Sequence, residues 1–157
     1  MKILQVSAIV VILDQISKIL TRSSLSLYES VPIIPKFFHL TYVTNDGMAF
    51  GINFPGGIYI FTGLSLLLSI LLFWYLWIEK DGHIILRLSL SMILGGAIGN
   101  LIDRIIFGKV VDFLDFMIGD YHWYVFNIAD SSVTVGMTIF LYYSFFIQPK
   151  LEAKTAS

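Results

Sequence analysis

Two aspartates in the last third of the chain are the residues best suited to chemistry. Asp112 lies in the run VVDF (110–113), and Asp130 ends the run FNIAD (126–130). Both fall within one short interval of a chain that is otherwise strongly apolar. A carboxylate at membrane depth costs about 2.5–3.5 kcal/mol on insertion scales, so two of them point to a use. Hydrolysis by a carboxylate pair is the chemistry that they fit best.

A pair of neighbouring carboxylates can activate water without any other group. In a low-dielectric site two close carboxylates do not both ionise, so one pKa rises and the pair holds one proton. The charged member then takes a proton from water, while the neutral member donates one to a carbonyl oxygen. Taken singly, Asp112 or Asp130 also fits a structural acid paired with Arg104 or Lys109. Together, at one membrane surface, they favour the shared-proton dyad.

Other nucleophiles and metal ligands are poorly placed. Cysteine is absent, which excludes a thiolate nucleophile and thiolate metal ligands. No histidine or lysine is placed by sequence beside Ser131 or Ser132, so a serine nucleophile is disfavoured. The three histidines are scattered along the chain, at 39, 83 and 122, and we expect no metal site and no cofactor.

The composition is that of an integral membrane protein. Of 157 residues, 57% are hydrophobic and 13% are charged, with a mean hydropathy of +0.82. A soluble domain carries about one-quarter charged residues. The net charge of −1 argues against a nucleic-acid partner, because no basic surface is available to neutralise phosphates. We expect one domain over residues 1–157. The apolar run 3–13 is interpreted as an uncleaved first span, because no small-x-small cleavage site follows it.

Four apolar segments are candidates to cross the bilayer, which takes about 20 apolar residues per helix. The expected fold is an all-α membrane protein with four transmembrane helices and a small extracytoplasmic β-sheet or hairpin. That hairpin is predicted between spans one and two, where polar and apolar residues alternate in 23–55 and Asn45-Asp46-Gly47 is a turn signal. Four spans place both termini on the same side. The predicted spans are about 3–20, 58–78, 84–107 and 131–147.

The polar residues of these antiparallel spans meet at one end. Asp14 and Lys18 come late in span one, Asn100 and Arg104 late in span three, and Asp130 opens span four. Basic residues divide five against five between the two sides. Setting aside the two inside spans leaves five against three, which favours cytoplasmic termini by the positive-inside rule. The chemistry is therefore predicted on the outer side.

Several of these residues also fit purely structural roles. Asp14 and Lys18, four apart, form an ion pair that lets a short span insert, or else they position a loop or a lipid head group. Arg104 fits a snorkelling arginine. Asn45 fits turn chemistry. Asn100 is harder to explain by structure alone, because a buried amide must find hydrogen-bond partners. Gly95 and Gly99 indicate close helix packing.

Five stretches together resemble the lipoprotein signal peptidase family, also called signal peptidase II. They are DQISK (14–18), NDGMAF (45–50), GGAIGNLIDR (95–104), VVDF (110–113) and FNIAD (126–130). They follow the family's order and span nearly the whole chain. One small departure is the acid and thioether at Asp46 and Met48, where the family often has smaller or neutral residues.

The resemblance implies an aspartic endopeptidase of the bacterial cytoplasmic (inner) membrane, with its active site toward the outer face. Its substrates would be prolipoproteins carrying a diacylglyceryl group, cut just before the modified cysteine. It implies membrane lipid as a partner, and we expect the chain to function as a monomer. By motif, Asp112 and Asp130 take the catalytic positions. The residues that match the site's substrate-binding or supporting positions are Asp14, Lys18, Asn45, Gly47, Asn100, Arg104 and Asn127.

Two other functions compete with this interpretation. A small proton-coupled transporter could use the same acids as a relay, but it needs polar residues through the full membrane depth. A non-catalytic assembly or lipid-binding factor could share the topology, but it would not require both Asp112 and Asp130.

Overall fold

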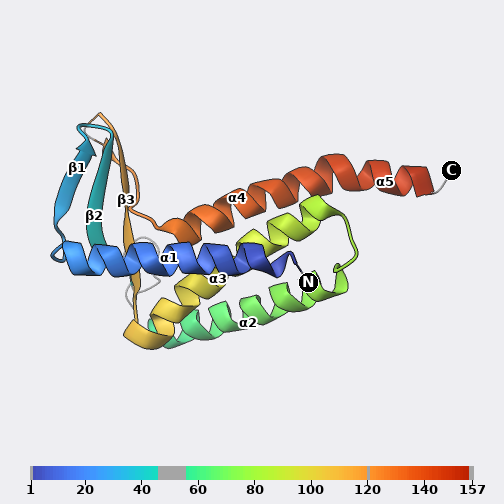
Figure 1. Cartoon of the computed structure of the whole chain (residues 1–157), viewed down its shortest axis with the longest axis horizontal. Helices are drawn as coiled ribbons and strands as arrows, with labels where there is room; N and C mark the ends of the chain where they lie inside the picture. The colour runs from blue at the N-terminus through green and yellow to red at the C-terminus, as the bar shows by residue number, and fades with distance from the viewer. Residues whose placement is uncertain (1, 46–55, 120, 156–157) are drawn as a thin grey trace.

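The computed structural model describes residues 2–45, 56–119 and 121–155. A bundle of helices carries a small sheet at one end, and both chain ends lie toward the other end (Figure 1). The helices are α1 (Leu4–Ser24), α2 (Gly57–Ile78), α3 (Ile84–Phe107), α4 (Ile128–Tyr142) and α5 (Gln148–Thr155). The strands are β1 (Ser30–Ile34), β2 (Phe38–Asn45), β3 (Val110–Ile118) and β4 (Tyr121–His122).

Three helices of the described segments, α1, α2 and α3, are long and apolar enough to cross a membrane. Their bounds agree with the predicted spans, except that α1 continues to Ser24. Helix α4 has only 15 residues, but a π-helical turn, η2 (Tyr143–Ile147), joins it to α5. Pro149 explains the wide turn, because its ring cannot donate a hydrogen bond and would clash with the Phe145 carbonyl in a regular helix.

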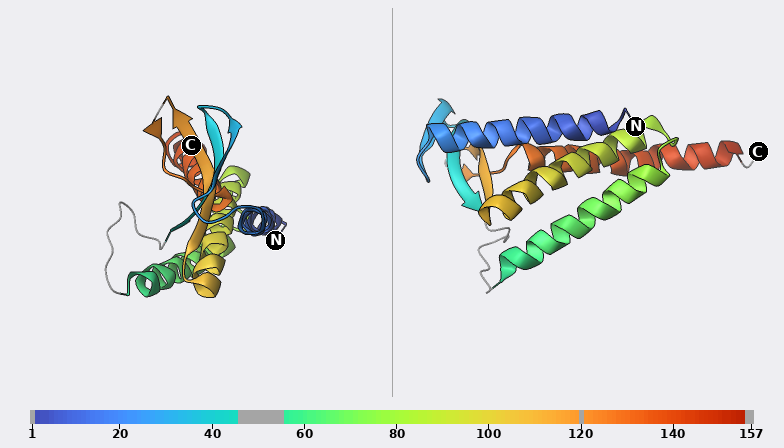
Figure 2. Two further views of the ribbon diagram at one scale, coloured as in Figure 1. Left: turned by 90° about the vertical axis from the view of Figure 1, so that its left-hand side faces the viewer. Right: turned by 60° about the horizontal axis from the view of Figure 1, so that its bottom comes forward.

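Helix α3 is the centre of the bundle and packs against α1, α2 and α4. Its glycines allow this close approach. A methyl group at Gly96 would collide with the Ala129 carbonyl oxygen of α4, and one at Gly95 would lie 2.8 Å from Val10 of α1. The packing role predicted for Gly95 and Gly99 is thus confirmed. Helix α2 diverges from the others toward the sheet end (Figure 2), and most of its side chains face outward.

The sheet is larger than the predicted hairpin. Its strand order is β1-β2-β3-β4, and every neighbouring pair is antiparallel. The first two strands come from the connection between α1 and α2, as expected. The other two come from the connection between α3 and α4, for which no strand was predicted. This difference matters for the site, because β3 carries Asp112.

Candidate active site

Asp112 and Asp130 meet where the sheet joins the helix bundle. Helix α3 ends at Gly108, whose φ of +68° turns the chain directly into β3. Asp112 is therefore the third residue of β3, and its side chain is only 3% exposed. Asp130 is half-buried in the first turn of α4. The two aspartates thus come from different elements, a strand and a helix, and lie at the same end of the bundle.

Two asparagine side chains connect the carboxyl groups. Asn127 Nδ2 donates to Asp112 Oδ1 at 2.6 Å and lies 3.1 Å from Asn100 Oδ1. Asn100 Nδ2 in turn donates to Asp130 Oδ1 at 2.7 Å. Both asparagines are buried, so their hydrogen bonds hold the two carboxyl groups in a defined relation.

Asp130 also belongs to the cap of its own helix. Asn127 Oδ1 accepts from the Asp130 N–H at 2.9 Å, and Asp130 Oδ2 accepts from the Asn127 N–H at 3.3 Å. This capping box satisfies donors that the start of α4 would otherwise leave free. Asp130 Oδ2 thus accepts a backbone N–H at the positive end of α4, and Oδ1 accepts the Asn100 amide, an arrangement that stabilises a carboxylate.

Asp112 has the opposite electrostatic environment. Burial, and then the negative charge of Asp130, raise the pKa of Asp112 to about 7, against an ordinary value of 3.8. Hydrogen bonds from Asn127 and Asn45 act in the other direction but do not outweigh burial. Asn45, at the end of β2 opposite Val110, is thus part of the site. Gly47 lies outside the described residues.

A second set of charged residues lies beneath the dyad, completely buried. Lys18 Nζ lies 2.8 Å from Asp14 Oδ2 and 3.3 Å from Asp103 Oδ2, and all three side chains are 0% exposed. It also donates to Asn100 Oδ1 at 2.9 Å. We call Asp14, Lys18 and Asp103 the buried triad. Asp14 and Lys18 form the predicted pair, and Asp103 brings a second carboxylate to the same ammonium group.

The buried triad holds the backbone beside each aspartate of the dyad. Asp103 Oδ2 accepts from the Val111 N–H at 3.0 Å, one residue before Asp112. Asp14 Oδ1 accepts from the Ala129 N–H at 2.9 Å, one residue before Asp130. Lys18 binds both carboxylates, so a single ammonium group links the supports of the two sides of the site.

Arg104 links α3 to α2. Its Nη1 donates to Ser65 Oγ at 3.2 Å, and its guanidinium is close enough to interact electrostatically with Asp130 and Asp112. Within the described ranges, its buried Nε has no hydrogen-bond partner. Arg104 is therefore held at the site and not free at the surface as a snorkelling side chain.

Asp103 and Gln15 were not predicted as site residues. Gln15 Nε2 lies 3.2 Å from Asp14 Oδ2 and 3.3 Å from Asp103 Oδ1, so it joins the two carboxylates of the buried triad. The sequence did indicate that these residues lie near the site, since Gln15 is in the stretch DQISK and Asp103 is in GGAIGNLIDR. The spacing of three residues places Asp103 on the same helix face as Asn100, whereas no spacing indicates the direction of Gln15.

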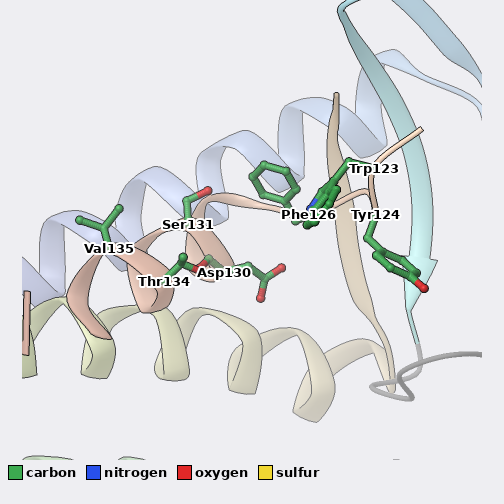
Figure 3. A pocket seen from close by; sticks show the side chains of 7 residues that line it. All are labelled: Trp123, Tyr124, Phe126, Asp130, Ser131, Thr134 and Val135. Atoms are coloured by element: carbon green, nitrogen blue, oxygen red, sulfur yellow. The ribbon is translucent and has the colours of Figure 1, made fainter. Parts of the chain in front are cut away.

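A cavity of about 350 Å³ opens beside Asp130. Figure 3 shows the Asp130 carboxyl group extending from α4 toward the segment that carries Trp123 and Tyr124. The lining combines aromatic rings, three hydroxyl groups and one carboxylate. Searching 2–45, 56–119 and 121–155 gives no group of three or more acidic or histidine side chains placed to hold a metal ion. The cavity residues are Trp123, Tyr124, Phe126, Asp130, Ser131, Thr134 and Val135.

Comparison with known proteins gives one consistent family. The profile of signal peptidase (SPase) II matches residues 6–146. The lipoprotein signal peptidase of Desulforapulum autotrophicum is 44% identical over 146 residues, covering 90% of each chain. That of Halothermothrix orenii is 48% identical over 136 residues, covering 86% of this chain and 89% of the relative.

The fold has solved counterparts. A bacterial membrane enzyme aligns with a TM-score of 0.83 and 32% identity, covering 93% of this chain and 94% of the other. A second one aligns with a TM-score of 0.78 and 34% identity, covering 88% and 84%. With the profile match and the long alignments to curated relatives, this chain belongs to the signal peptidase II family.

Proposed function

We propose that this chain is a membrane aspartic endopeptidase that removes the signal peptide from prolipoproteins. Removal of signal peptides is the activity named by the family, and the curated relatives are lipoprotein signal peptidases. The finer parts of the proposal are the aspartic mechanism, a diacylglyceryl-modified substrate and cleavage just before the modified cysteine. The observation that carries the proposal is the amide-linked pair of carboxyl groups at the sheet end of the bundle.

The environments of the two aspartates support different roles for them. With a pKa of about 7, Asp112 still carries its proton in about half of the molecules at neutral pH, whereas an ordinary carboxyl group is almost fully ionised. Asp130, whose oxygens accept N–H groups, is then the carboxylate. In the first step Asp130 removes a proton from water as the oxygen attacks the scissile carbonyl, and Asp112 donates its proton to the carbonyl oxygen.

The second step restores both groups. The tetrahedral intermediate collapses when Asp130 passes its newly acquired proton to the leaving nitrogen, and Asp112 takes back the proton from the hydroxyl oxygen. The carbon–nitrogen bond breaks, which leaves a carboxylic acid and an amine. Arg104 is the group we propose for binding the substrate's polar backbone, because its guanidinium lies close enough to Asp130 and Asp112 to interact with both electrostatically. A positioned donor of this type is worth about 3–4 kcal/mol in other enzymes.

The arrangement of the helices supports a multi-pass position, with the whole chain as one domain. We propose that α4, η2 and the start of α5 form the fourth span, because the helix continues without a break after α4. The termini would then be cytoplasmic, and the sheet and dyad would lie at the outer face of the bacterial inner membrane. Access to lipid-modified substrates would come from the bilayer, and one chain would suffice for the chemistry.

Neither competing function is supported. The polar side chains of the site gather at one end of the bundle, whereas a proton-coupled transporter needs a path through its full depth. Ser69 is polar, and the other buried residues of α2, Gly57 and Leu76, are not. An assembly factor gives no reason for the amide link between Asp112 and Asp130.

The decisive experiment is incubation of the purified protein with a diacylglyceryl-modified prolipoprotein and, in parallel, with the unmodified precursor. Only the modified form should be cleaved, and mass spectrometry of the product should place the new N-terminus at the modified cysteine. Asp112→Asn and Asp130→Asn should each lower kcat by at least about a thousandfold while the protein still folds. Near-normal cleavage by either variant would remove that residue from the dyad.

A further inference from the structure

A second cluster of polar side chains crosses the sheet away from the dyad. It contains Ser30 of β1, Thr41 of β2, Asp115 of β3 and His122 of β4, and His39 of β2 lies beside it, 3.3 Å from Ser30 Oγ. Asp115 is the buried member, with 2% exposure. A buried carboxylate requires hydrogen-bond donors, because burial without them is costly. The donors here come from the neighbouring strands on both sides.

The direction of each hydrogen bond follows from the chemistry of the groups. Thr41 Oγ1 donates its single hydrogen to Asp115 Oδ2 at 2.7 Å, so at the 2.8 Å contact with Ser30 it accepts. His122 Nδ1 lies 2.9 and 3.1 Å from the two oxygens of Asp115. A carboxylate only accepts, so His122 must carry its hydrogen on Nδ1.

The hydrogen bond between His122 and Asp115 attaches the two-residue strand β4 to β3. Strand β4 has two residues, and it pairs with β3 only through Met117↔His122 and Ile118↔Tyr121. Asp115 is the diagonal neighbour of His122 on the same face of the sheet, within reach of a side-chain contact. A strand this short has little stability of its own. The side-chain contact between His122 and Asp115 therefore adds to the backbone pairing that keeps β4 against β3.

The residues that follow β4 form one wall of the cavity beside Asp130. We call Trp123, Tyr124 and Phe126 the aromatic wall. Phe126 is bound to β3 by backbone hydrogen bonds with Leu114 at 2.7 and 3.1 Å. Trp123 and Tyr124 are more than half exposed, and the Trp123 N–H donates to the Phe116 carbonyl at 2.8 Å. Their placement depends on the alignment of β4 just before them.

We propose that Asp115 and His122 are positioning residues that hold the aromatic wall in place for substrate binding. The inference rests on the proposed peptidase function, since it takes the cavity beside Asp130 as the place where substrate binds. Neither residue contacts Asp112 or Asp130 in the described structure. Their loss should therefore weaken substrate binding more than it slows the chemical step.

The test compares His122→Ala with His122→Asn. Alanine removes the donor, whereas the asparagine amide places an N–H close to the position of Nδ1. His122→Ala should raise KM for a lipidated prolipoprotein by about threefold to fivefold, the range for one half-exposed polar contact, with kcat nearly unchanged. His122→Asn should restore KM. The matched control is His83→Asn at the far end of the bundle, which keeps the side-chain acceptor that caps α3 and should change neither constant.

Trp123 provides a readout that does not depend on activity. The chain has three tryptophans, so Trp74→Phe and Trp77→Phe leave Trp123 as the single indole emitter. In this background, without substrate, His122→Ala should increase acrylamide quenching of Trp123, and His122→Asn should reverse the increase. Asp115→Asn, which keeps a carbonyl oxygen but loses the charge, should give a smaller increase.

Two results would overturn the proposal. One is wild-type quenching of Trp123 in His122→Ala, which would show that β4 does not need the bond. The other is a fall in kcat with KM unchanged, which would place His122 in the chemistry. If instead Asp112→Asn proved active, the proposed mechanism would fail, yet the quenching result would still decide the role of His122.

Discussion

At the scale of single residues, the two carboxyl groups of the proposed dyad differ in their surroundings. Asp112 is enclosed at the start of β3, whereas Asp130 accepts a backbone N–H at the start of α4 and the Asn100 amide. In the proposed mechanism, Asp112 is therefore the proton donor and Asp130 the carboxylate.

The pH dependence of activity should have its upper limit near neutrality. Asp112 must be protonated to donate to the carbonyl oxygen, and its pKa is about 7. Above that pH, kcat/KM should fall by about tenfold per pH unit. Initial rates on a lipidated substrate between pH 5 and pH 9 provide the measurement. A flat profile up to pH 9 would contradict the assignment of Asp112 as the acid.

The stability of the folded protein should also depend on pH through Asp112. The pKa of Asp112 is higher in the folded state, so between about pH 4 and pH 7 only the folded state keeps this proton. The contribution of Asp112 to stability is therefore present below pH 4 and is lost as pH rises to about 7. Asp112→Asn has no proton to lose. Its thermal midpoint in detergent should exceed that of wild type at pH 8, and the difference should shrink at pH 4.

Asn127 combines two tasks that substitution can separate. Its carbonyl oxygen caps α4, and its amide nitrogen binds Asp112. Serine is a good N-cap but has no amide group, so Asn127→Ser should keep the helix start while it lowers kcat by about a hundredfold. Asn127→Ala should lose the cap as well, at a further cost of about 1 kcal/mol in unfolding free energy. Equal kcat for Asn127→Ser and wild type would show that the amide link is dispensable.

At the scale of elements, the buried triad joins α1 to α3 and, through backbone hydrogen bonds, to β3 and α4. Removing one partner of a buried ion pair costs about 3–5 kcal/mol, because the other charge stays buried without compensation. Lys18→Met should therefore lower the thermal midpoint strongly and abolish cleavage. Thermal unfolding in detergent, alongside the exposed control Lys80→Met, measures the effect. An unchanged midpoint would show that the triad is not needed for the fold.

The close contact between α3 and α1 at Gly99 can also be tested by substitution. A methyl group at Gly99 would lie 2.6 Å from Asp14 Oδ2, whereas one at Gly63 of α2 has nothing within 4 Å. Gly99→Ala should displace Asp14 and cost about 1–3 kcal/mol through overpacking. Gly63→Ala should be neutral or slightly stabilising, since alanine favours a helix. Similar midpoints for the two variants would mean that α1 can move away from α3.

The helices could be predicted from the sequence, whereas strand β3 could not. The helices followed from long apolar runs, whose period and length are local properties. Strand β3 was missed because its pairing with β2 joins residues that are about 65 to 78 positions apart, and its sequence VVDFLDFMI shows no alternation of polar and apolar residues. Asp112 and Asp130 were identified because acids are rare in such a chain. Asp103 was not assigned to the site, since its role depends on the β3 amide that lies against it.

At the scale of the whole molecule, the proposed topology makes a labelling prediction. The chain contains no cysteine, so single introduced cysteines report their own position without interference. In intact cells, Ser30→Cys on β1 should react with a membrane-impermeant maleimide, whereas Lys150→Cys on α5 should react only after the membrane is opened. The opposite pattern would invert the topology. Labelling at both sites in intact cells would contradict the fourth span.

The Lys18 link has a consequence for how the enzyme is made. Lys18 lies on α1, whereas the backbone it helps to fix, at Ala129, lies on α4, which is synthesised after α1, α2 and α3. A nascent chain therefore has no complete site until α4 has been made and has packed against α1 and α3.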